Sequence, residues 1–218
     1  MPDCCGPGSA RYEEVFDRRF ADALARRYRR HGLNAVERRI VDRLAATGIT
    51  GATVLEVGGG IGEIQLELLR RGAHATTNLE LSREYEPAAR QLLAEAGMTG
   101  RATRIVGVDL ATAGDRIDAA DYVVLHRVVC CYPDGVLLVA AAASHARRAV
   151  VFSHPPRNWL TRTAVWASNA WMRIRGRAYR GYVHTPADLY RAAREAGFSV
   201  ATTLRRGPAW TVAEATRS

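Results

Sequence analysis

Large hydrophobic side chains recur at helical spacing over the first part of the chain. Over residues 11–31 they stand three or four positions apart among charged residues: Tyr12, Val15, Phe16, Phe20, Leu24 and Tyr28. Because the helical repeat brings such positions to one side, the pattern predicts one amphipathic helix. A second helix is predicted from about Asn34 to Ala46, and Gly48 provides its stop signal.

From residue 53 the pattern changes to short β-branched runs that alternate with helical segments. The predicted strands cover residues 53–57, 74–81, 102–108, 121–126 and 149–153. The helices between them are expected near residues 62–71, 83–97, 112–118 and 134–147. This alternation favours βαβ units, and hence a parallel sheet with helices on both faces.

The last third of the chain predicts two further helices and a hairpin. Residues 159–175 carry tryptophans and aliphatic side chains at helical spacing, and another helix is expected over residues 186–196. The runs FSVATTL and AWTVAEA then alternate on either side of residues 205–208, which favours an antiparallel hairpin. We therefore expect an α/β fold whose sheet is mostly parallel and ends in an antiparallel C-terminal hairpin.

The composition narrows the function classes. A chain of 218 residues can bury one good core, but it is too short for two full domains with separate sites. All 31 basic residues are arginine, and the absence of lysine excludes Schiff-base chemistry, a pyridoxal-phosphate anchor and a Walker-A site. The net charge of +9 would suit nucleic acid, an anionic membrane surface or an acidic substrate, although a solvated arginine face is the simpler explanation.

Targeting signals and cysteine usage indicate the compartment. The sequence has neither the apolar core of a signal peptide nor the apolar run of a membrane span, so we expect a cytoplasmic protein. The cysteines form two adjacent pairs, Cys4-Cys5 and Cys130-Cys131, which fits a reducing compartment. The four thiols could jointly hold a soft metal, but incidental cysteines are the simpler explanation and no metal site is predicted.

A glycine-rich turn follows the first predicted strand, in the stretch VLEVGGGIGE. Gly58, Gly60 and Gly62 have G-x-G-x-G spacing, which lets the backbone pass close to a ligand before a helix begins. Dinucleotide-binding turns place a small residue where this chain has Glu63, and this difference weakens an NAD-binding interpretation.

Two carboxylates at the ends of the next strands suit a nucleoside. Glu80 closes the second strand, where it could accept both ribose hydroxyls, and Asp109 follows the third, where it could accept the adenine amino group. An adenosine without phosphates needs these contacts. The alternative is that both carboxylates only cap helices.

This set of residues resembles that of the class I S-adenosylmethionine-dependent methyltransferases, from about residue 33 to the C-terminus. The resemblance implies a Rossmann-like methyltransferase sheet with S-adenosyl-L-methionine as cofactor. The residues implied to bind it are Glu56, Gly58, Gly60, Gly62, Glu80, Asp109 and His126. Residues 1–32 would form an N-terminal helical lid, and residues 33–218 the cofactor-binding domain with an inserted helix at about 159–175.

Two later stretches are similar to the magnesium-protoporphyrin methyltransferase branch of that superfamily. They are Cys131-Tyr132-Pro133 and the segment from Arg177-Ala178-Tyr179 to Val183-His184. The branch has His-Tyr-Pro at the first of these places. Because Cys131 departs from that pattern, the acceptor is left open.

Candidate catalytic groups follow the fourth and fifth strands, since the acceptor side of such a sheet is built there. We expect His126 to act as a base or an orienting group, with His154 as a second candidate base and Tyr132 shaping the acceptor pocket. A structural role for His126 is an equally good interpretation.

Candidate substrate-binding residues are Arg127, Cys131 and Trp159. Arg127 could hold a carboxylate of the acceptor through two hydrogen bonds, or it could pair with Asp121 or Asp118.

The function expected is methyl transfer to an oxygen or nitrogen of a small molecule, in specialised metabolism. The alternative is a methyltransferase-like fold that serves as a partner protein or catalyses another reaction. Nucleic acid is disfavoured as a substrate, because HRVVCCYP lacks the Asn-Pro-Pro-aromatic run of exocyclic amine methylases and no recognition module is appended. For the tryptophan segment, core packing or a substrate lid is favoured over membrane contact, and of these two the lid over the acceptor is preferred. The oligomeric state is left open.

Overall fold

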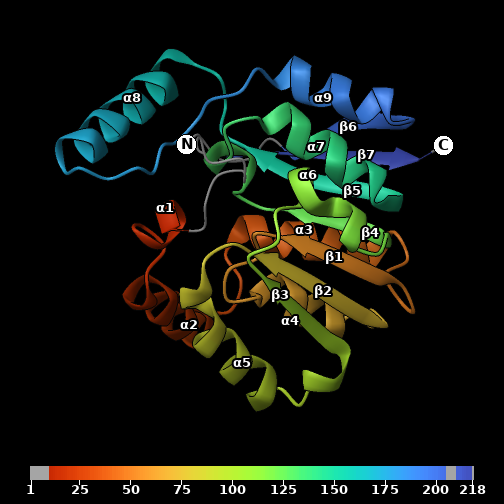
Figure 1. Cartoon of the computed structure of the whole chain (residues 1–218). Helices are drawn as coiled ribbons and strands as arrows, with labels where there is room; N and C mark the ends of the chain where they lie inside the picture. Colours follow the sequence, from red (N-terminus) through yellow and green to blue (C-terminus); the bar gives the residue numbers. More distant parts are fainter. Residues whose placement is uncertain (1–9, 205–209, 218) are drawn as a thin grey trace.

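The computed structural model describes residues 10–204 and 210–217 and contains a seven-stranded sheet in the order β3-β2-β1-β4-β5-β7-β6 (Figure 1). The strands are β1 (Thr53–Val57), β2 (Ala75–Glu80), β3 (Ala102–Val106), β4 (Ala120–Leu125), β5 (Ala146–His154), β6 (Phe198–Leu204) and β7 (Thr211–Arg217). The first five strands are parallel, and β7 pairs antiparallel with both β5 and β6. The expected sheet and its antiparallel hairpin are confirmed. The predicted turn at residues 205–208 lies outside the described residues.

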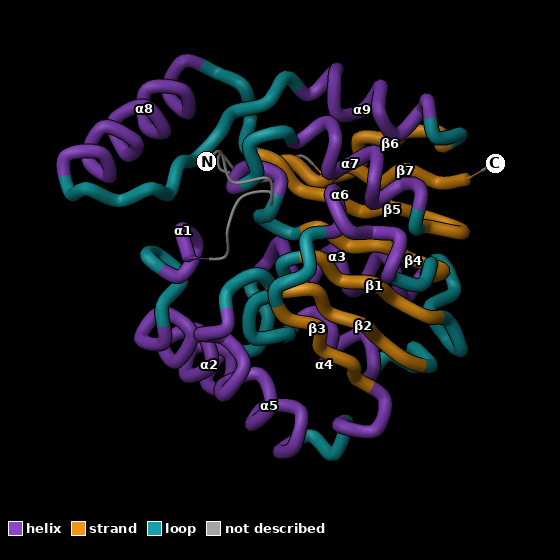
Figure 2. Tube along the Cα trace, in the orientation of Figure 1, coloured by secondary structure: helices purple, strands orange, loops and turns teal. Residues whose placement is uncertain are grey.

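Helices cover both faces of this sheet (Figure 2). They are α1 (Ala10–Glu13), α2 (Arg18–His31), α3 (Ala35–Ala46), α4 (Glu63–Arg70), α5 (Glu86–Glu95), α6 (Leu110–Ala113), α7 (Gly135–Ser144), α8 (Trp159–Ile174) and α9 (Pro186–Glu195). Short 3₁₀ turns are η1 (Arg83–Tyr85), η2 (Thr99–Arg101), η3 (Gly114–Arg116) and η4 (Val129–Cys131).

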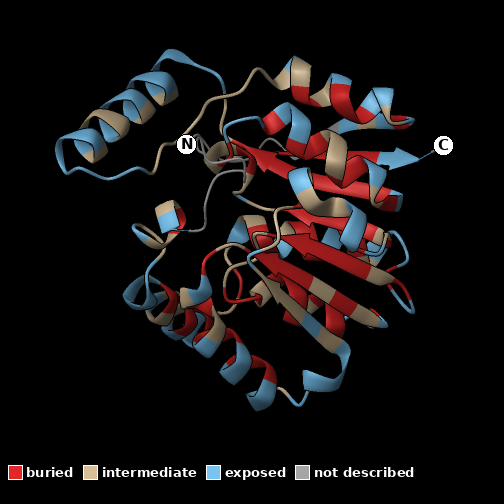
Figure 3. Ribbon diagram, viewed as in Figure 1, coloured by how far each residue is buried: buried red, intermediate tan, exposed pale blue. Residues whose placement is uncertain are grey.

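The core lies on the two faces of the sheet, because successive strand residues point to opposite sides. On β4, Tyr122 and Val124 pack with α2 to α5, whereas Val123 and Leu125 pack with α6, α7 and α9. Burial on both faces explains why the central strands read as continuous apolar runs rather than as alternating ones (Figure 3).

The predicted continuous helix over residues 11–31 is wrong, because the chain breaks between α1 and α2. The Asp17 side chain accepts a hydrogen bond from the Phe20 amide at 2.8 Å and starts a new helix there. The carbonyl of Phe16 turns away and accepts a hydrogen bond from Ser82. By contrast, the helix expected after Asn34 is confirmed, and Asn34 and Glu37 form a capping box at its start.

Helix α8 stands apart from the layered body. It has no buried residue, and Figure 3 shows it in the colours of exposed and intermediate burial along its whole length. The expectation of core packing for the tryptophan segment is therefore wrong. In the part of the chain that the structure describes, no helix is long and apolar enough to cross a membrane.

Candidate functional site

A cavity of about 310 Å³ opens at the carboxyl ends of β1, β2 and β4, a volume typical of small-molecule sites. The glycine turn, the strand-end carboxylates and the residues after β4 form its inner wall, and three aromatic side chains and one leucine from the N-terminal segment form its outer wall. Residues of that outer wall are Tyr12, Phe16, Phe20 and Leu24.

The glycine turn is a backbone surface from which side chains are excluded. Gly58, Gly60 and Gly62 have φ values of 62°, 55° and 79°, a region that residues with a Cβ rarely adopt. A Cβ on Gly58 would lie 2.6 Å from the Val128 side chain. Glycine is therefore required here for both conformation and close approach.

Glu80 and Arg104 hold the turn in place from opposite sides. Glu80 Oε2 accepts a hydrogen bond from the Gly60 amide at 2.9 Å, and Oε1 accepts one from the Ser82 amide at 2.9 Å. Arg104 donates to the Gly60 carbonyl at 2.8 Å and pairs with Glu86 at 2.6 Å. Burial raises the pKa of Glu80, while these amides act to lower it. Arg104 was not predicted as a site residue, because its role depends on how β3 lies beside the turn.

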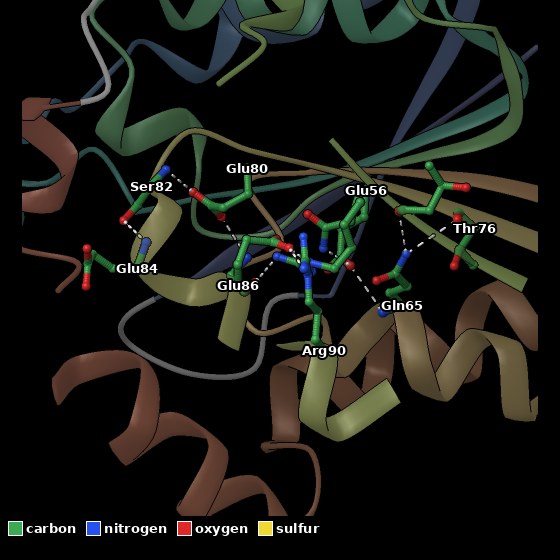
Figure 4. A network of polar contacts seen from close by, with 12 residues as sticks. Glu56, Gln65, Thr76, Glu80, Ser82, Glu84, Glu86 and Arg90 are labelled. Atoms are coloured by element: carbon green, nitrogen blue, oxygen red, sulfur yellow. Dashed lines mark hydrogen bonds and ion pairs between the residues drawn. The ribbon is translucent and has the colours of Figure 1, made fainter. Parts of the chain in front are cut away.

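Glu56 lies deeper beneath the same turn (Figure 4). Its Oε2 accepts hydrogen bonds from the Gln65 amide at 3.1 Å and from Asn78 Nδ2 at 3.2 Å. Burial raises the pKa of Glu56 well above its usual value, and the Glu63 carboxylate raises it further. Glu56 thus adds a strongly buried acid to the inner wall of the cavity.

Asp109 both caps a helix and lines the cavity. It caps α6 by accepting a hydrogen bond from the Ala111 amide at 3.0 Å, and it also lines the cavity. Its second oxygen accepts a hydrogen bond from the Tyr132 hydroxyl at 2.9 Å. Tyr132 is therefore tied to the Asp109 side of the cavity, and burial together with Asp109 raises the pKa of its hydroxyl.

His126 directly follows β4 and lines the cavity. Its Nδ1 lies 3.0 Å from Ser153 Oγ, and its buried Nε2 has no hydrogen-bond partner among the described residues. Burial first, and then the Arg127 charge, lowers the pKa of His126 to about 3. The imidazole is consequently neutral near pH 7.

Arg127 is held at the cavity by its backbone. It has a φ of 61°, and its amide donates to Ser153 Oγ at 2.8 Å. The exposed guanidinium lies 5.3 Å from the centre of the Trp210 ring. The alternative pairing with Asp121 is wrong, since Asp121 instead pairs with Arg148.

Cys131 joins the cavity to the segment that follows α8. Its Sγ accepts a hydrogen bond from the Tyr179 hydroxyl at 3.1 Å, and its carbonyl accepts one from the Tyr12 hydroxyl at 3.2 Å. The hydrogen bonds with Cys130 and Tyr179 lower the pKa of Cys131. Tyr179 lies in one of the two stretches that resemble the porphyrin branch, but its contact with Cys131 was not predicted, because it depends on how this distant segment packs against η4.

Two predicted site residues do not line the cavity. His154 is buried, its Nδ1 lies 3.0 Å from the Pro155 carbonyl, and its Nε2 lies 2.8 Å from the Tyr190 hydroxyl. Its side chain therefore lies on the other face of β5 from Ser153. Trp159 is 72% exposed at the start of α8.

The fifth strand contributes Ser153 to the site instead of His154. Leu125 pairs with Phe152, so the next residues along each strand, His126 and Ser153, are neighbours. The register of β5 against β4 would have been needed to predict Ser153 as a site residue. As for metals, the described residues contain no group of three or more candidate ligands, and Cys4-Cys5 lie outside them.

Comparison with known proteins gives a family match over most of the chain. The model of the methyltransferase-domain family matches residues 21–203. No curated protein matches.

Similar solved structures share the fold. One is a magnesium protoporphyrin IX methyltransferase from Synechocystis PCC 6803 with bound SAH, at 24% identity and a TM-score of 0.72, covering 95% of this chain and 98% of that one. Another is an O-methyltransferase family protein from Burkholderia thailandensis, at 22% identity and a TM-score of 0.69, covering 91% of this chain and 58% of that one.

Proposed function

The chain belongs to the methyltransferase-domain family of class I, S-adenosylmethionine-dependent enzymes, and from that premise we propose that it methylates a small molecule at an oxygen or nitrogen atom. One residue set would hold the cofactor and another the acceptor, and both line the same cavity. Specialised metabolism is the setting we propose for this reaction.

The residues of the inner wall fit S-adenosylmethionine. Gly58 and Gly60 leave the backbone bare, and Glu80 presents a buried carboxylate that already accepts hydrogen bonds from the Gly60 and Ser82 amides. Glu80 would hold the ribose hydroxyls and Asp109 the adenine amino group. When bound, the cofactor supplies a methyl group already activated on a sulfonium, so the protein has mainly to position the acceptor.

The observation that carries the proposal is the unpaired Nε2 of His126 in this cavity. A buried polar atom without a partner is costly, and an acceptor group that hydrogen-bonds to it would remove that cost. Ser153 fixes the ring by its contact with Nδ1. His126 would therefore orient the acceptor.

The low pKa of His126 also limits the acceptors. An imidazole whose pKa is about 3 is a weak base at neutral pH, so it would not readily remove a hydroxyl proton. Acceptors that need no strong base, such as a carboxylate or an amine, fit better. Arg127 has no carboxylate partner among the described ion pairs and could bind an anionic acceptor.

We further propose that the N-terminal segment closes over the acceptor as a lid. Tyr12 and Phe16 are held across the cavity by hydrogen bonds to Cys131 and Ser82, and Phe16 packs edge-on against Tyr179. These contacts join two segments far apart in the sequence. Such a cover would exclude water from the site during transfer.

Calorimetry with S-adenosylmethionine tests the cofactor assignment. Glu80→Ala should weaken binding by about 1–3 kcal/mol, because two ribose hydroxyls would lose their carboxylate partner. Glu84→Ala is the matched control, since Glu84 is a nearby acid that does not line the cavity. Equal affinity in the parent and Glu80→Ala would contradict the assignment. Cofactor binding without methyl transfer to any acidic or amine acceptor would favour a non-methylating role instead.

A further inference from the structure

Helix α8 presents a broad apolar face to solvent. The face consists of Trp159, Leu160, Trp166, Trp171 and Ile174, whose exposure ranges from 56% for Trp171 to 77% for Ile174. At one residue per 100° these positions fall within an arc of about 140°. Isolated exposed hydrophobic residues are ordinary, but a contiguous group of this kind marks an interaction surface.

Helix α8 is tied through Asn169, outside the apolar arc, to the segment that follows it, and that segment is tied to Glu14. Asn169 donates to the Gly181 carbonyl at 2.8 Å and accepts from the Gly181 amide at 2.8 Å. Glu14 accepts hydrogen bonds from the amides of Ala178 and Tyr179. Because these contacts hold the helix without its tryptophans, the apolar face is free for another partner.

The segment of chain that carries this face has charges of a single sign. Residues 155–187 include no aspartate or glutamate and contain six arginines: Arg157, Arg162, Arg173, Arg175, Arg177 and Arg180. At helical spacing Arg162 and Arg173 fall beside the apolar arc, next to Trp166. Among the described residues, neither has an ion pair with a carboxylate.

We propose that α8 binds the surface of an anionic phospholipid bilayer. An amphipathic helix with tryptophans and aliphatic side chains on one face and arginines at its border lies in the plane of such an interface. The tryptophans would enter the headgroup region, and the arginines would meet lipid phosphates. The helix lies on the surface and does not cross the bilayer.

Two other partners fit the observations less well. A second copy docked through the same face would bring two arginine borders together, and residues 155–187 contain no acid to pair with them. A single-stranded nucleic acid could stack on the tryptophans, but it would not use the exposed aliphatic side chains of Leu160 and Ile174.

Vesicle sedimentation tests the proposal on the full chain. The protein should bind vesicles of equal phosphatidylcholine and phosphatidylglycerol, and not vesicles of phosphatidylcholine alone. The variant Trp159→Ser/Trp166→Ser/Trp171→Ser should bind the anionic vesicles at least about tenfold more weakly. Leu137→Ser is the matched control, because Leu137 is an exposed apolar residue on α7.

Changes in charge give an independent readout. Replacing Arg162 and Arg173 by Gln should weaken binding to the anionic vesicles roughly fivefold for each arginine, whereas Arg194→Gln on α9 should not. Circular dichroism would verify that each variant is folded. Failure of the parent protein to bind anionic vesicles overturns the proposal. So does a dimer, or a complex with a single-stranded oligonucleotide, that forms in preference to vesicle binding and is lost in the tryptophan variant.

Discussion

Ser153→Ala should reveal how the site depends on one buried hydroxyl. Ser153 has no exposed surface, and its Oγ serves two groups, the Arg127 amide at 2.8 Å and His126 Nδ1 at 3.0 Å. The substitution removes both contacts and supplies no replacement. Each buried group left without a partner costs about 1–3 kcal/mol.

The expected loss in the free energy of unfolding is therefore about 2–4 kcal/mol, with some relief where water reaches the exposed side of Arg127. Urea unfolding measures it, and an unchanged denaturant slope would show that the same surface is exposed on unfolding. Methyl transfer should also fall, because the His126 ring is no longer fixed, while cofactor affinity should change little.

Ser144→Ala is the control for this substitution. Its hydroxyl donates to the Ala141 carbonyl on an exposed helix end, so the effect should stay below about 0.5 kcal/mol. The reasoning would be refuted if Ser153→Ala were as stable and as active as Ser144→Ala. Loss of cofactor binding together with activity would instead place His126 in the cofactor contact.

Two further predictions concern buried carboxylates. Burial, and then the Glu37 charge, raises the pKa of Glu63 to about 7, so the folded state loses stability as pH rises toward that value. The stability gained by Glu63→Gln in urea unfolding should therefore grow from about pH 5 and level off above about pH 7. A gain that does not depend on pH would contradict this prediction. Arg43→Met should lower the free energy of unfolding by about 2–4 kcal/mol, measured by heat or urea, because it leaves the buried Glu214 carboxylate without its ion-pair partner. Arg71→Met, which breaks an exposed ion pair with Asp42, should lower it by less than about 1 kcal/mol, and equal losses in the two variants would contradict the prediction.

The sheet and its glycine turn could be predicted because their signals are local. Strand patterns, the positions of Gly58 and Gly60, and the strand-end carboxylates all lie within short windows of sequence. The elements they predict occur in the structure with small shifts at their ends. The binding roles of these residues stay predictions.

The acceptor side could not be predicted in the same way, because it depends on packing between distant segments. His154 and Ser153 are adjacent in sequence, and only the register of β5 against β4 decides which of them faces His126. The hydrogen bond from the Tyr132 hydroxyl to Asp109 likewise depends on the packing of two separate segments, and the role of Tyr132 toward the acceptor stays a prediction. The break at Asp17 is a capping interaction that competes with an otherwise continuous apolar stripe.

The two walls of the cavity come from separate stretches of the chain, and this division affects how the protein can evolve. The inner wall is encoded between Glu56 and Tyr132, whereas the outer wall comes from residues 12–24. If the proposed acceptor site is correct, mutations in residues 12–24 can reshape it without changing the residues that hold the glycine turn. Duplicated copies of such a gene could thus acquire new acceptors through changes in residues 12–24, while they keep the same residues for the methyl donor.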